Sequence, residues 1–231
     1  LDDKVERMEI SDFSFPQEQS MSLYIENAQK FTIRPSAIRK LASEQYHDVA
    51  IDSQVNLNLI QFYNTYPSSE VNGNFMTCWK MYADTPMDES VSQMLYPDIK
   101  NKIEGLSDVQ AVNQILNWVQ TAFQYEYDDK VWGHDRAFFA EETLYYPYCD
   151  CEDRAILFTR LVRDLLGLKC ILVYYPGHLA SAVCLKQQVN GDYISLDGDV
   201  YTICDPTYIG APVGITMPEM DNRSAKVIKL L

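Results

Sequence analysis

The strongest constraint on the fold lies in residues 150–204, where one amphipathic helix precedes four short apolar segments. Asp150 belongs to a residue type that caps helix starts, and Gly167 suits the left-handed conformation that ends them. Between these two residues the spacing predicts one helix, with an apolar stripe of Ala155, Phe158, Leu161, Val162 and Leu165. A helix with one apolar face needs a partner surface, and the segments that follow supply it.

Those segments are rich in β-branched and aromatic residues, which is typical of strands. They span 168–174, 178–186, 193–196 and 200–204. The dipeptides Asn190-Gly191 and Asp197-Gly198 predict turns between them. Helices followed by antiparallel strands indicate an α+β fold.

The upstream half gives weaker signals. Ser107 suits the N-cap of a second amphipathic helix. Further upstream, we predict helices over 35–47 and 52–67, a strand over 74–84 and a helix over 87–105 that is broken or kinked at Pro97. A long aromatic and acidic loop is predicted over 125–148. The first 104 residues therefore read as a mostly helical segment that buttresses a core at 105–231.

Charge and hydropathy narrow the possible partners. The chain has 33 acidic and 19 basic residues, a net charge of −14, so we expect no nucleic-acid partner, which would need a basic surface. No apolar run approaches the roughly 18 residues of a membrane span. The chain starts at Leu1 rather than Met, which we interpret as trimming. This favours export to the periplasm or cell surface, while the compartment and the oligomeric state stay open.

Cys149 and Cys151 lie at the start of the helix that follows Asp150, and three roles compete for them. A zinc clasp could add His178 but lacks a fourth ligand of the usual spacing, so we predict no metal. A disulfide between cysteines one residue apart would close a strained ring. The third role is a nucleophile at a helix N-terminus. The other cysteines, such as Cys170, Cys184 and Cys204, are expected to pack as small apolar residues.

A nucleophilic thiol needs more than a helix dipole, which is worth roughly 0.3–1 kcal/mol. An imidazole must supply most of the activation. Of the three histidines, only His178 opens a strand in the well-patterned half; His47 and His134 lie elsewhere. Asp205, at a strand end before Pro206, is the candidate that orients the imidazole. We expect Asp150 and Asp153 to cap the helix, and Glu152 to be a solvated charge.

The segments "DCEDRAILFTRLVRDLLG", "GHLASAV" and "DPTY" resemble the three signature blocks of the transglutaminase-like superfamily. The "DCED" form is most similar to the bacterial transglutaminase-like cysteine proteinases, and the resemblance spans roughly residues 105–215. It implies a papain-like core, with Cys151 as nucleophile, His178 as base and Asp205 as the residue that orients the base. One departure is Cys149, which stands where the family usually has glycine.

Further site residues are expected around these blocks. The backbone N–H of Cys151 is the natural first oxyanion donor, and Gln120, with Trp132 behind it, is the side-chain candidate for the second. Tyr146, Tyr148 and Tyr175 flank the blocks. They either wall a substrate cleft or pack at the edge of the core.

We therefore expect a cysteine peptidase that hydrolyses peptide or isopeptide bonds through an acyl-enzyme, without a cofactor. Its partner is a protein or peptide substrate. The alternatives are a transamidase or cell-wall peptide amidase on the same fold, and a scaffold or binding module without catalysis. The triad also sets a geometric requirement. The strands that begin with His178 and end before Asp205 must be antiparallel neighbours, with 188–198 an excursion beyond their far end.

Overall fold

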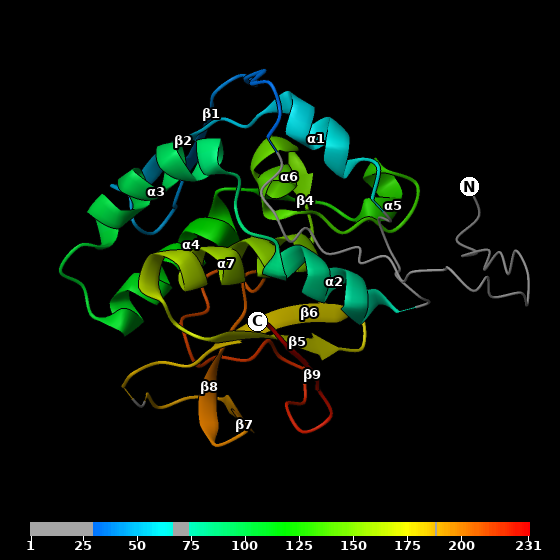
Figure 1. Cartoon of the computed structure of the whole chain (residues 1–231). Helices are drawn as coiled ribbons and strands as arrows, with labels where there is room; N and C mark the ends of the chain where they lie inside the picture. Colours follow the sequence, from blue (N-terminus) through cyan, green and yellow to red (C-terminus); the bar gives the residue numbers. More distant parts are fainter. Residues whose placement is uncertain (1–29, 67–73, 188) are drawn as a thin grey trace, which may run out of the picture.

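The computed structural model describes residues 30–66, 74–187 and 189–231. Within these ranges the chain is α+β, with seven helices and a five-stranded antiparallel sheet that forms a half-barrel. Figure 1 shows the helices on one side of this sheet, with α7 packed against it. The predicted fold class is confirmed at this level. No helix in the described part of the chain is long and apolar enough to cross a membrane.

The sheet has the strand order β7-β8-β6-β5-β9. Four of its strands match the predicted apolar segments and the fifth, near the C-terminus, was not predicted. The strands are β5 (Cys170–Tyr175), β6 (His178–Val183), β7 (Tyr193–Leu196), β8 (Asp199–Cys204) and β9 (Lys226–Lys229). All six residues of the central strand β6 are buried, because the sheet carries an apolar cluster on each face.

Only one of the two predicted turns joins paired strands. Asp197 and Gly198 have positive φ angles of 53° and 89° and connect β7 to β8 as a hairpin. Asn190-Gly191 lies in the excursion between β6 and β7, which do not pair. β8 returns beside β6 in antiparallel register, with Ser181 opposite Cys204. The required strand arrangement is therefore confirmed, and Asp205 lies beside the start of β6.

Helix α7 (Cys151–Leu166) lies against β5 and β6. It begins after Asp150 and ends at Gly167, whose φ of 64° is the left-handed conformation that glycine adopts at low cost. Helix α4 (Asp108–Thr121) packs alongside it. Ser107 caps α4 as predicted, in a capping box with Gln110. The buried residues of α4 and α7 form a large part of the hydrophobic core.

The predicted helix over 35–47 is wrong. The chain instead forms a hairpin of β1 (Arg39–Ala42) and β2 (Ala50–Ser53). Burial alternates along β2, which is the period of a strand with one covered face. The hairpin is fixed to α4 by tertiary bonds; for example, Trp118 Nε1 donates to Leu41 O at 3.0 Å. The predicted helix over 52–67 is confirmed only as α1 (Leu57–Tyr63).

The predicted strand over 74–84 is also wrong, because this segment is helix α2 (Phe75–Asp84). Asn74 caps it by accepting from Met76 N at 2.9 Å. Its buried residues include Cys78, Met81 and Tyr82, which share one face at helical spacing and pack toward α7.

Helix α3 (Glu89–Ile103) is not broken at Pro97, which lies inside it. Proline lacks the backbone N–H that would donate one helical hydrogen bond. The helix continues through it because buried residues on both sides of Pro97 pack on one face; these are Val91, Leu95, Ile99 and Ile103. The predicted loop over 125–148 contains four short elements. They are β3 (Gln124–Tyr125), α5 (Asp128–Val131), α6 (Ala140–Tyr145) and β4 (Tyr148–Cys149), with β3 and β4 paired in parallel.

Candidate active site

The start of α7 is held by the carboxylate of Asp153, which is fully buried. Its Oδ2 accepts from the backbone N of Asp150 at 3.2 Å, and its Oδ1 accepts from the backbone N of Phe138 at 2.8 Å. The first bond is the reciprocal half of a capping box, and the second ties the helix to the segment before α6. The expected capping role of Asp153 fits this geometry. It fixes Cys151 in the first turn of α7.

His178 and Asp205 meet at the adjacent ends of β6 and β8. His178 Nε2 lies 2.8 Å from Asp205 Oδ2, which confirms the predicted separation. Asp205 Oδ1 accepts from the backbone N of Thr207 at 2.9 Å and of Tyr208 at 3.2 Å. The carboxylate is therefore held from both sides and is almost fully buried.

This bond sets the tautomer of the imidazole. A carboxylate oxygen only accepts, so Nε2 carries the proton and donates it. In neutral His178, Nδ1 is then the ring nitrogen that can take up a proton.

Cys151 and His178 line the same pocket, which has a volume of roughly 290 Å³. The sulfur of Cys151 also receives a backbone hydrogen bond from Leu179, the residue after His178. Gly177, Leu179 and a set of aromatic and acidic side chains form the rest of the lining. The aromatic and acidic residues are Phe75, Trp79, Tyr125, Tyr127, Asp135, Asp150, Glu152 and Tyr174.

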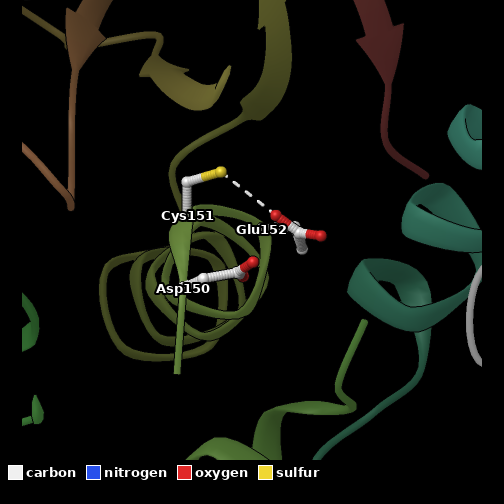
Figure 2. A group of neighbouring side chains, drawn as sticks. All are labelled: Asp150, Cys151 and Glu152. Carbon is white, nitrogen blue, oxygen red and sulfur yellow. Dashed lines mark hydrogen bonds between the residues drawn. The ribbon is translucent and has the colours of Figure 1, made fainter. Parts of the chain in front are cut away.

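Glu152 is not the solvated charge that we predicted, because it is only 5% exposed. Figure 2 shows Cys151 Sγ directed at its carboxyl group, to which the thiol donates at 3.1 Å. Burial, then the negative charges of Glu152 and Asp150, raises the pKa of Cys151 well above the ordinary thiol value. The resting form of Cys151 is therefore a neutral thiol.

Several acidic side chains lie close together near the Cys151 thiol. Ligand atoms lie within 4.8 Å of one another in three described groups, which are Asp150-Cys151-Glu152, Asp128-Asp135-Glu152 and Asp128-Asp150-Asp153. Such oxygen-rich groups suit hard cations. Burial, then the charges of Asp153, Glu152 and Asp128, raises the pKa of Asp150 to about 12. Asp128 has a pKa raised to about 7, chiefly by burial.

The side chain of Cys149 has different neighbours from that of Cys151. Its sulfur accepts from Nε of the buried Arg154 at 3.4 Å, and Arg154 also donates to the carbonyls of Gln120 and Phe123 at 3.0 and 2.7 Å. None of the described groups of metal-ligating atoms includes Cys149. All six cysteines are free. The Cys149 side chain is thus packed inward.

Gln120 is buried and its amide is engaged by the loop after β8. Nε2 donates to the carbonyls of Asp205, Tyr208 and Ala211 at 2.9–3.0 Å, and Oε1 accepts from Gly210 N at 3.2 Å. It is not among the described residues that line the pocket. The geometry therefore gives Gln120 a structural task, which is to hold the loop that carries Asp205.

The other predicted aromatic residues also lie outside the described pocket lining. Trp132 and Tyr146 pack edge to face at 4.9 Å, with the Arg136 guanidinium 4.3 Å from the Trp132 ring. Tyr175 lies on β5 and stacks on His178 with ring centroids 6.2 Å apart. Tyr148 is half-buried in β4.

Sequence reasoning found Cys151 and His178 but missed most of the other residues that line the pocket. Phe75 and Trp79 stand four residues apart on α2, so they share a face only if the segment is helical. Because residues 74–84 were predicted to form a strand, this four-residue spacing did not indicate a shared face. No family model, curated protein or solved structure matches this chain.

Replacement of Glu152 by glutamine should increase the reactivity of Cys151. The substitution removes a negative charge and a thiol acceptor, so the pKa of Cys151 should fall and more thiolate should form at neutral pH. We expect roughly tenfold faster alkylation by iodoacetamide at pH 7, which corresponds to about one pKa unit. The rate is measured across pH, with the modified cysteine mapped by mass spectrometry. Glu44→Gln, at an exposed position, is the matched control. An unchanged pH profile for Glu152→Gln would contradict this electrostatic role.

Proposed function

We propose that this protein is a thiol-dependent acyl-transfer enzyme, most simply a cysteine peptidase that hydrolyses peptide or isopeptide bonds. Cys151 is the nucleophile, His178 the general base and Asp205 the residue that orients the base. The observation that carries this proposal is the 2.8 Å His178–Asp205 bond beside the pocket that Cys151 lines. The assignment agrees with the resemblance to transglutaminase-like cysteine proteinases.

In the proposed reaction, the thiol proton of Cys151 passes to Nδ1 of His178 as Sγ attacks the amide carbonyl carbon. The tetrahedral oxyanion is stabilised by the backbone N–H of Cys151 at the helix start. The C–N bond breaks as His178 returns the proton to the leaving amine. Water, deprotonated by His178, then hydrolyses the thioester, and the thiol is regenerated.

Glu152 has a part in this scheme. At rest the thiol donates to Glu152, so proton transfer to His178 requires the Cys151 side chain to leave that acceptor. We assign this step to substrate binding. Until the pocket is filled, the Cys151 thiol then reacts slowly with electrophiles from solvent.

The finer fold assignment is part of the proposal. A helix that carries the nucleophile at its N-terminus and packs on an antiparallel sheet with the base and its partner is a papain-like arrangement, here residues 105–231. The described part of the segment up to residue 104, residues 30–66 and 74–104, buttresses this core. It also supplies Phe75 and Trp79 to the pocket.

One observation favours the second candidate, a binding module without catalysis. Cys151 is surrounded by carboxylates that oppose its ionisation. The same observation fits an enzyme whose thiol ionises only during attack, so the two candidates must be separated by reactivity.

Substitution of Asp205 tests the triad. An asparagine side chain at this position can still accept from the turn after β8, but its amide nitrogen donates and would force His178 Nε2 to accept, with the proton moved to Nδ1. We expect Asp205→Asn to lower kcat/KM for peptide hydrolysis by about 10²–10⁴-fold with little change in Tm. His178→Ala should have a similar effect. Full activity in either variant would exclude the proposed triad, whereas a non-catalytic module would show no Cys151-dependent hydrolysis in any variant.

A further inference from the structure

The pocket beside Cys151 has acidic side chains along its wall. Asp135, Asp150 and Glu152 line it, and no lysine or arginine does so among the described residues. Asp128 lies behind this wall, with a carboxylate oxygen within 4.8 Å of one on Asp135 and one on Glu152. Asp135 is exposed at the pocket mouth, whereas Asp128, Asp150 and Glu152 are buried. Buried acidic groups this close together are stabilised by a nearby positive charge, so the pocket favours a cation.

Two guanidinium groups of this region are engaged elsewhere. Arg136 pairs with Glu142 at 2.9 Å and lies 4.3 Å from the Trp132 ring. Arg154 donates to two backbone carbonyls and to Cys149. Oδ1 of Asp150 is buried and has no hydrogen-bond partner within the described part of the chain, although Asp150 is only 7% exposed and lines the pocket. An acceptor site for a donor from outside the protein is thus present.

The rest of the pocket is aromatic, which distinguishes an organic cation from an inorganic one. Phe75, Trp79, Tyr125, Tyr127 and Tyr174 line it together with the carboxylates. Aromatic faces attract ammonium and guanidinium groups and also pack on the methylene stems of lysine and arginine. A site for a bare metal ion has no need of these rings.

We infer that this pocket binds a positively charged group of the substrate, a lysine or arginine side chain next to the bond that Cys151 attacks. The inference rests on the proposed function and names its substrate class, which is basic peptides. A bound cation would also offset the charge of Glu152, which opposes ionisation of the Cys151 thiol. Substrate charge would then help to activate the nucleophile.

The first experiment measures pocket charge through the reactivity of Cys151. Two methanethiosulfonate reagents of similar size are compared, the cationic 2-aminoethyl and the anionic 2-sulfonatoethyl compounds. In both, the thiolate attacks the sulfenyl sulfur, a disulfide forms and methanesulfinate leaves. For each reagent, the rate of its reaction with Cys151 is divided by the rate of its reaction with 2-mercaptoethanol, a neutral thiol. This ratio removes the difference in intrinsic reactivity between the two reagents. We expect a cation preference of at least about tenfold at Cys151, reduced in 0.5 M NaCl.

Asp135→Asn should lower this preference several-fold, while Asp129→Asn should not, because Asp129 is exposed and outside the pocket lining.

The second experiment needs no catalysis. Binding of N-acetyl-arginine amide and its neutral isostere N-acetyl-citrulline amide to Cys151→Ala protein is measured by calorimetry in EDTA and in 2 mM CaCl₂. We expect at least about tenfold tighter binding of the arginine compound in EDTA.

The outcomes separate the two proposals. Equal binding of both compounds would overturn the cation pocket, even if Cys151-dependent hydrolysis is found. Arginine-selective binding without hydrolysis would support the pocket and reject the enzyme. Loss of arginine binding in CaCl₂ together with calcium binding in the absence of peptide would assign the carboxylates to a metal ion and overturn the inference.

Discussion

Cys151→Ala should abolish turnover, lowering kcat for peptide hydrolysis by at least about three orders of magnitude. No other described side chain that lines the pocket offers a nucleophile of comparable strength next to His178. Loss of a triad nucleophile in other hydrolases has effects of this size or larger. The measurement is single-turnover and steady-state hydrolysis of a basic fluorogenic peptide.

The folded state should survive this change, since Cys151 contributes one small side chain at a pocket wall. Thermal unfolding of Cys151→Ala should therefore resemble that of the unmodified protein. Cys184→Ala is the matched control, because Cys184 is a free, half-buried cysteine outside the pocket lining. Undiminished hydrolysis by Cys151→Ala would reject the thiol mechanism.

Phe139→Ala should produce a large loss of stability. The Phe139 ring is fully buried and stacks between Tyr63 and Tyr82, with centroid separations of 3.9 and 3.8 Å. It also meets Tyr66 edge to face at 5.3 Å. Truncation removes these contacts and leaves a cavity, which costs about 3–5 kcal/mol. The free energy of unfolding is measured by urea denaturation.

Phe75→Ala is the matched control, because Phe75 is 42% exposed and its ring stacks on Trp79 at the protein surface. We expect it to cost less than about 1 kcal/mol. A similar loss for both variants would show that the Phe139 cluster does not join α1, α2 and α6 as tightly as its geometry indicates.

The C-terminal half was predictable because its signals are local. Asp150 and Gly167 mark the ends of α7, and each strand of β5 to β8 is short, apolar and bounded by turn residues. The antiparallel pairing of β6 with β8 followed from the requirement that Asp205 reach His178. Strand β9 gave no such signal, since it is four residues long and only one of them is buried.

The N-terminal half was not predictable from local signals. The β1–β2 hairpin is defined by bonds to α4, including those of Trp118 with Leu41 and of Asn117 with Ser43, across more than 70 residues. Likewise, the burial of Glu152 and the engagement of Gln120 by the loop after β8 depend on elements far apart in the chain. Propensity carries no information about such contacts.

The contribution of α2 to the pocket has a consequence for how such a protein can change over time. The groups proposed to perform the chemistry lie on α7, β6 and the end of β8, whereas Phe75 and Trp79 come from a helix encoded far upstream. Substitutions at these two positions should alter the shape of one pocket wall, and with it the proposed affinity for a cation, without touching the bond between His178 and Asp205. Mutations can therefore change the substrate selectivity of the pocket without changing the groups proposed to perform the reaction. Laboratory selection for a new substrate can begin with a library restricted to Phe75 and Trp79.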